Sequence, residues 1–238
     1  YNLKPEDGRI FYEDEDDHKI YNKSLKEILI KKGLLDETMY QEFISIMNNY
    51  RSTDDTKTYN YMNIDFSEHA TGLFLHKKEN DIFDLYILNS GYGVENHESK
   101  SYVIDNKIVA PAIMIIKNVK LEKIIKFITI FREAEPIIDY DYYYNLIKII
   151  FYDSEKQYLH YYEQNSNNCT IYRYFLALIA FLYIKKNKHD NDDIKKINES
   201  ITIFRYTVFF IYFIINKQNT MLSDNRYDKY YELFMIND

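Results

Sequence analysis

The only cysteine of the 238 residues, Cys169, stands where a polar stretch meets an apolar one. Residues 164–168, QNSNN, are polar, and the helical period of the residues after Cys169 predicts a helix over 170–186. A thiol is a useful nucleophile only as a thiolate, and the unpaired N–H groups and dipole of a helix N-terminus lower its pKa. Gln164 could donate a hydrogen bond to an oxyanion. The pattern is typical of a nucleophilic cysteine, although free cysteines also pack as inert core residues.

A histidine and an asparagine are placed where they could activate such a thiol. The apolar runs 72–75 and 83–88 predict two antiparallel strands, with the polar residues 76–81 as the turn between them. His69 precedes the first strand and Asn89 follows the second, so we expect the two to be neighbours at one end of the hairpin. His69 could then be the general base, and the amide oxygen of Asn89 could accept a hydrogen bond from its imidazole.

Each of these residues also has a simpler interpretation. Asn89 could cap a strand and start a turn, Gln164 could be an ordinary loop amide, and His69 could lie on the surface. His97 is a rival for the general base, because it follows the same hairpin and could approach the same site. His76 falls in the predicted turn, where we expect a solvated side chain.

Cofactors, metals and nucleic acid are not expected. The sequence contains no phosphate-binding glycine loop, no dinucleotide fingerprint and no HExxH motif. A zinc site made of Cys169, His69, His97 and an acid fits no standard ligand spacing. The net charge of -7 and the pI near 5.5 argue against a general nucleic-acid binder. A single cysteine forms no internal disulfide, so we expect a reducing, cytoplasmic compartment.

The order of the candidate residues resembles that in a clan of cysteine proteases. His69 opens HATGLFL, Asn89 ends YILN, and Gln164 leads into QNSNNC. The clan comprises the SUMO/ubiquitin-like proteases, the adenovirus-type proteases and related bacterial effector proteases. In it a His opens a strand, an Asp, Asn or Glu ends the next, and a Gln precedes the Cys of the central helix. Ala70 and Thr170 replace the usual Trp and Gly, so the chain is most similar to divergent bacterial-effector or viral members.

The resemblance implies a thiol-dependent peptidase or isopeptidase that cleaves ubiquitin, a ubiquitin-like modifier or a precursor protein. It assigns Cys169 as nucleophile, His69 as general base and then acid, and Asn89 as the residue that orients the imidazole. Gln164 and the backbone N–H of Cys169 would form the oxyanion hole. Two alternatives stay open: an effector-type acyltransferase on the same scaffold, and a non-catalytic protein-binding module with a degenerate triad. We expect a monomer, possibly delivered into or made inside a host cell.

The expected fold class is α+β, with a small mixed or antiparallel sheet packed on a central helix that begins at Cys169. Residues 65–185 would be the catalytic core of a single domain over 1–238. Other regions follow from period and composition: an arm at 1–20, helical substrate-facing regions at 24–60 and 118–152, and C-terminal helices at 190–238.

Further elements are expected inside these regions. Strands are predicted at 101–105, 108–116 and 158–162, and helices at 121–132 and 142–151. The apolar runs 175–184 and 207–215 are shorter than the roughly 18–20 residues of a membrane span. We therefore expect both runs to be core helices.

Overall fold

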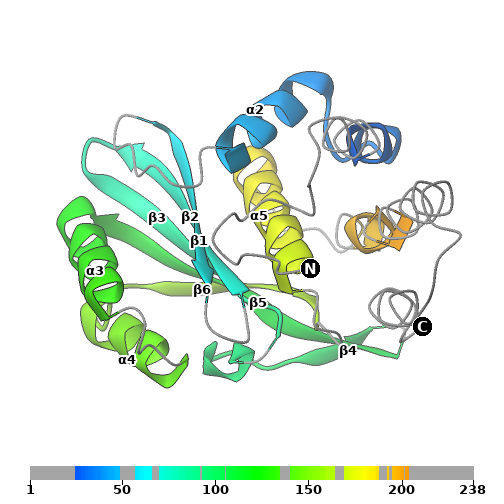
Figure 1. Ribbon diagram of the computed structural model, residues 1–238. Coiled ribbons are helices and arrows are strands. Elements are labelled where there is room, and N and C mark those ends of the chain that lie inside the picture. The colour runs from blue at the N-terminus through cyan, green and yellow to red at the C-terminus, as the bar shows by residue number, and fades with distance from the viewer. Residues whose placement is uncertain are drawn as a thin grey trace, which may run out of the picture.

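The chain folds as three layers, with a sheet between two layers of helices (Figure 1). The computed structural model describes residues 25–48, 57–65, 70–91, 93–104, 106–134, 140–163, 169–187, 192, 195–200 and 202–203. The strands are β1 (Tyr59–Asp65), β2 (Ala70–Glu79), β3 (Ile82–Leu88), β4 (Tyr102–Ile104), β5 (Lys107–Lys120) and β6 (Lys156–Tyr162). The helices are α2 (Glu37–Asn48), α3 (Leu121–Ala134), α4 (Tyr140–Ile150), α5 (Cys169–Lys186) and the short 3₁₀ helix η2 (Val94–Asn96). Residues 25–31 and 195–200 are also helical.

All strand pairs in the described sheet are antiparallel. The order is β1-β2-β3-β5-β4, and β6 also pairs with β5. β5 has 14 residues and pairs with three strands. β4 pairs with its first residues, and β3 and β6 pair with the rest. The turn between β2 and β3 is only two residues long, with Asn80 at a positive φ of 28°.

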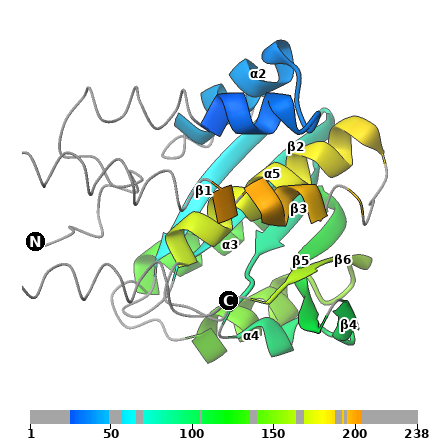
Figure 2. The same ribbon diagram turned by 90° about the vertical axis from the view of Figure 1, so that its right-hand side faces the viewer.

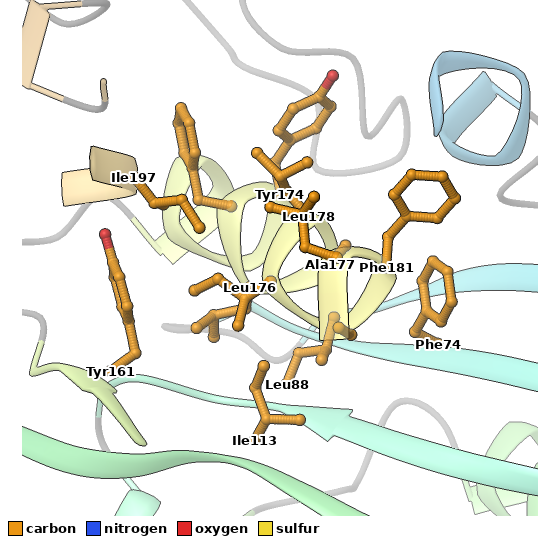
Figure 3. Packing of buried hydrophobic residues seen from close by; sticks show 14 of the residues in the cluster. Phe74, Leu88, Ile113, Tyr161, Tyr174, Leu176, Ala177, Leu178, Phe181 and Ile197 are labelled. Atoms are coloured by element: carbon orange, nitrogen blue, oxygen red, sulfur yellow. The ribbon is translucent and has the colours of Figure 1, made fainter. Parts of the chain in front are cut away.

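The two faces of the sheet bury separate apolar clusters, as the alternation of strand side chains requires. Phe74 and Leu88 point to the layer that holds α2 and α5, whereas Leu73 and Ile87 point to the layer of α3 and α4. Figure 3 shows Leu176 of α5 above Leu88, and Phe181 of the same helix beside Phe74. Removing these apolar side chains from water stabilises the fold and fixes the register of the strands that carry them.

α5 is apolar on nearly all sides because other elements surround it. Figure 2 shows it crossing in front of the strands. Phe43 of α2 lies 5.2 Å from the ring of Tyr174 and 5.6 Å from that of Phe181, centroid to centroid. Ile197 packs against the same cluster. A helix that is covered in this way needs no polar face, which explains the apolar run in its sequence.

The α+β class predicted from the sequence is confirmed. The strand predicted at 83–88 and the helix predicted at 121–132 match β3 and α3 within a few residues. The central helix predicted from Thr170 begins at Cys169. The apolar run 175–184 is part of this buried helix, as expected, and no helix among the described residues is long and apolar enough to cross a membrane.

Two predictions about the sheet were wrong. The region 24–60 was expected to be helical, but β1 begins at Tyr59 and is an edge strand of the described sheet. The turn expected at 76–81 is mostly strand, because β2 runs to Glu79. His76 is therefore a strand residue and is half-buried, with its ring stacked on that of Tyr59 at 5.2 Å. It pairs across the sheet with Tyr59 because antiparallel neighbours place directly opposed side chains in contact.

Several expectations lie outside the described residues. They are the arm at 1–20, the apolar run at 207–215 and most of the C-terminal helices expected over 190–238. The substrate-facing region expected at 118–152 contains the end of β5 followed by α3 and α4.

Candidate functional site

Cys169 is the first residue of α5 and lies at the end of the sheet where β2 begins. The other end of α5 is fixed by Lys185, whose Nζ lies 5.3 Å from the ring centroid of Tyr59. Tyr59 pairs with His76, which is near the far end of β2. The first turn of α5 must therefore lie over the near end of β2, which starts at Ala70.

The structure describes only part of the predicted site. Asn89 follows the last residue of β3, and its N–H donates to the carbonyl oxygen of Ala112 at 2.8 Å. His69 directly precedes the first residue of β2, but it lies outside the described residues, as does Gln164. The backbone thus brings the start of β2, the end of β3 and the start of α5 to one end of the sheet.

Asn89 is fully buried and belongs to a chain of hydrogen bonds. Its Nδ2 lies 2.9 Å from the hydroxyl oxygen of Tyr144, which belongs to α4. The same hydroxyl lies 3.1 Å from Nε2 of His97, and Nδ1 of His97 contacts the carbonyl oxygen of Pro111. On its other side, Oδ1 of Asn89 accepts a hydrogen bond from the N–H of Gly91 at 3.0 Å.

The direction of each hydrogen bond in this chain follows from its carbonyl end. The oxygen of Pro111 can only accept, so Nδ1 of His97 carries the proton and donates it. In the neutral ring Nε2 is then an acceptor, and the hydroxyl of Tyr144 donates to it. The hydroxyl oxygen accepts in turn from the amide of Asn89. The N–H of Gly91 independently requires that Oδ1 of Asn89 face it. The two ends of this hydrogen-bond series therefore give the same orientation of the Asn89 amide.

His97 does not have the surroundings of a general base. It is buried, and burial lowers its pKa to about 4, although the bond to the oxygen of Pro111 acts in the opposite sense. Its two ring nitrogens are held by Pro111 and Tyr144, and the ring packs edge-on against that of Tyr144 with centroids 5.6 Å apart. A base must reach the proton that it removes. The arrangement therefore favours a structural role for His97 over the catalytic one left open by the sequence.

The side chain of Asn89 is directed away from α5. Tyr144 belongs to the apolar cluster on the α3–α4 side of the sheet, whereas α5 covers the other side. Thr71 of β2 is on the same side as Tyr144, because it lies two residues before Leu73, whose side chain packs in the same cluster as Tyr144. The structure thus joins Asn89 to α4 and η2, not to the first turn of α5.

Two buried polar residues accompany the first turns of α5. Arg173 is buried one turn after Cys169, a spacing that places both positions on one face of the helix. Tyr161 of β6 has a fully buried hydroxyl with no hydrogen-bond partner in the described part of the chain. Burial raises the pKa of Tyr161, and so do the neighbouring hydroxyls, Tyr172 of α5 first among them. A buried orphan hydroxyl costs free energy, and such groups are uncommon in folded proteins.

A second polar cluster lies at the opposite end of the sheet. Asp84 is buried in β3, where its Oδ1 accepts from the N–H of Asn118 at 2.9 Å. Its Oδ2 lies 3.5 Å from Nζ of Lys117 and 3.7 Å from Nζ of Lys78. The pairing between β3 and β5 shifts at this point, and Asn118 has a positive φ of 52°. The carboxylate thus satisfies the backbone of a β-bulge, which is a structural role.

Comparison with known proteins gives no relationship: the sequence matches no protein-family model, no curated protein and no solved structure. No group of histidine, cysteine and acidic residues among the described residues could hold a metal ion.

The role of Tyr144 in this network was not predicted from the sequence. Tyr144 lies in the tyrosine-rich segment 140–144, in which nothing distinguishes one tyrosine from the next. Its period within α4 predicts only that it is buried. Tyr144 lies 55 positions from Asn89 and 47 positions from His97 in the sequence. Its contacts with them depend on how α4 packs on the sheet.

Proposed function

We propose that the protein is a thiol-dependent peptidase or isopeptidase with Cys169 as its nucleophile. The observation that carries the proposal is the position of this residue, the only cysteine of the chain, as the first residue of the buried helix α5. The helix starts at the end of the sheet where β2 begins and β3 ends. The helix dipole favours a thiolate at this position.

The reaction would proceed through an acyl-enzyme. The thiolate of Cys169 attacks the carbonyl carbon of the scissile bond and gives a tetrahedral oxyanion, which Gln164 and the N–H of Cys169 stabilise. The imidazolium of His69 protonates the leaving amine as the carbon–nitrogen bond breaks, and a thioester remains. His69 then takes a proton from water, the hydroxide attacks the thioester, and collapse returns the thiolate and releases the acid.

The substrate that we propose is ubiquitin, a ubiquitin-like modifier or a precursor protein with a similar tail. This part rests on the order of His69, Asn89, Gln164 and Cys169 in the sequence, which resembles that of the ubiquitin-like proteases. An imidazole hydrogen-bonded to Asn89 is compatible with the bond from Gly91, because an amide oxygen can accept two donors.

One observation favours a second candidate function, a non-catalytic protein-binding module. The amide of Asn89 is held by Tyr144 on the side of the sheet opposite α5, which is the side away from the proposed nucleophile. In the binding module this asparagine would serve only to fix α4 on the sheet.

Hydrolysis of fluorogenic C-terminal derivatives of ubiquitin and ubiquitin-like modifiers tests the proposal. The wild type should release the fluorophore, and the Cys169→Ala variant should not, with an unchanged melting temperature. Asn89→Ala should lower kcat if this residue orients the base. Activity retained by Cys169→Ala would overturn the proposal. Inactivity of the wild type on every derivative, together with a thiol of ordinary reactivity, would favour the binding module.

A further inference from the structure

α4 presents an apolar strip to solvent on the side opposite the sheet. The buried face of the helix consists of Tyr143, Tyr144, Leu146, Ile147 and Ile150. On the other face Ile149 is 71% exposed and Tyr142 is 42% exposed, and Tyr152, just past the helix end, is 79% exposed. Large apolar side chains that gather on one exposed side of a helix are typical of an interaction surface.

The spacing of this strip is that of a helix–helix seam. Within α4, Tyr142, Asn145 and Ile149 follow one another at intervals of three and four residues (145 − 142, 149 − 145). These intervals are those of the a and d positions of a heptad repeat. Asn145 is exposed and stands at a d position near the middle of the helix. A polar asparagine in a seam of this kind specifies register and orientation.

The charges beside the strip are complementary to those of a second copy. Asp141 and Lys148 occupy the two g positions, are both exposed, and make no ion pair within the described part of the chain. In an antiparallel pair of helices g positions face g positions. The midpoint between positions 141 and 148 along the helix falls between residues 144 and 145, beside Asn145. A two-fold axis at this point would place each Asp141 opposite the partner's Lys148. The seam is thus self-complementary, as an isologous interface must be.

A parallel pair is less compatible with the charges. There the acid after Lys148 in the seam would be the partner's Asp153, but Asp153 lies in the turn past the end of α4, and its Oδ1 is already 2.6 Å from Nζ of Lys123. We propose that the protein forms a two-fold dimer through antiparallel pairing of α4 with α4 of a second copy. The occupant of this surface is therefore another molecule of the same chain, which differs from the monomer expected from the sequence.

The dimer should be weak. α4 has 11 residues and spans about 16 Å, which is short for an interface of the standard size of roughly 1,600 Å². Ile125 of the neighbouring helix α3 is also exposed and could extend the contact. We expect dissociation in the micromolar range or above.

Sedimentation velocity over two orders of magnitude of protein concentration, starting at low micromolar, tests the proposal. The wild type should sediment faster as its concentration rises. Ile149→Asp should weaken association at least tenfold. Val103→Asp, a control at a residue of β4 that is 66% exposed, should not. A wild type that stays monomeric, or an Ile149→Asp variant that associates like the wild type, would overturn the proposal.

Mixing two charge variants tests the antiparallel orientation. In a dimer of the Asp141→Lys variant, lysines would face lysines across the seam. In a dimer of the Lys148→Asp variant, aspartates would face aspartates, so each variant alone should stay monomeric. In a one-to-one mixture every lysine would face an aspartate of the other variant, and association should return. Because a misfolded variant could not recover on mixing, this result is independent of the fold. An Asp141→Lys variant that still dimerises, or a mixture of monomers, would contradict the antiparallel seam.

Discussion

The hydroxyl of Tyr144 joins Asn89 to His97: it lies 2.9 Å from Nδ2 of Asn89 and 3.1 Å from Nε2 of His97. All three side chains are buried. The bond from His97 to the oxygen of Pro111 continues the chain into β5. This small network fastens α4 and the segment after η2 to the same end of the sheet as the start of α5.

Replacement of Tyr144 by Phe should destabilise the protein by about 2–4 kcal/mol, because it removes the partner of two buried polar groups. The acceptor Nε2 of His97 would lose its donor, and Nδ2 of Asn89 would lose its acceptor. Chemical denaturation at neutral pH measures the change.

Tyr161→Phe is the matched control for that variant. Both tyrosines are fully buried, but the hydroxyl of Tyr161 has no hydrogen-bond partner among the described residues. Its removal should leave stability unchanged or raise it by about 1 kcal/mol. Equal losses in the two variants would contradict the assignment of the hydrogen bonds.

Stability should fall in mild acid because His97 is buried in its neutral form. The ordinary pKa of 6.5 is lowered to about 4 in the folded protein, so the unfolded chain binds more protons between these two values. The stabilising effect is complete above pH 6.5 and is lost as the pH falls through this window. Between pH 7 and pH 5 this one group should cost about 2 kcal/mol.

Denaturation of the wild type and of His97→Gln at several pH values checks the effect. The variant should be less stable at pH 7, since it disrupts the buried network, but its stability should change less between pH 7 and pH 5. An identical pH dependence in the two proteins would show that another group is responsible.

The glycine before η2 should be sensitive to substitution. Gly93 has a φ of +88°, and a Cβ there would lie 2.8 Å from Cδ1 of Tyr140 and 3.2 Å from Cε2 of Tyr144. Gly33 has a φ of +67°, but a Cβ there would meet nothing within 4 Å. Gly33→Ala should therefore cost only the backbone strain of about 1 kcal/mol, and Gly93→Ala about 2–3 kcal/mol because it also displaces the two rings. Thermal unfolding compares the two, and similar losses would contradict this account.

A buried ion pair and an exposed one should contribute differently to the stability of the protein. Asp84→Ala should lower the free energy of unfolding by about 2–3 kcal/mol. It removes the acceptor of the Asn118 N–H at the bulge and the carboxylate that pairs with Lys117. Asp153→Ala removes a shorter ion pair with Lys123, but Asp153 is exposed and water screens the pair, so the loss should be much smaller than that of Asp84→Ala. A larger loss for Asp153→Ala, measured by denaturation, would reverse the ranking.

The parts of the fold that were predictable have simple local patterns. The apolar residues of β3, which only Asp84 interrupts, and the polar stretch before α5 define these elements without tertiary information. β1, YNYMNID, was missed because Asn60 and Asn63 interrupt its apolar residues. The charged end of β2, from His76 to Glu79, continues as strand only because β1 and β3 pair with it.

The candidate site was predictable only in the position of its backbone. That Asn89 closes β3 and Cys169 opens α5 follows from period and turn chemistry. The direction of the Asn89 side chain does not, because it depends on the packing of α4 against the far side of the sheet. The role of Tyr144 depends on the same long-range contact.

Reaction with thiol-reactive probes tests the central claim most directly, because Cys169 is the only cysteine. The protein would be incubated with ubiquitin and ubiquitin-like modifiers that carry a C-terminal electrophile, and adducts would be mapped by mass spectrometry. A stoichiometric adduct on Cys169 with at least one modifier, lost in the His69→Ala variant, is the predicted result. No adduct with any modifier, from a thiol that a small alkylating agent labels only at the rate of an ordinary cysteine, would contradict the account.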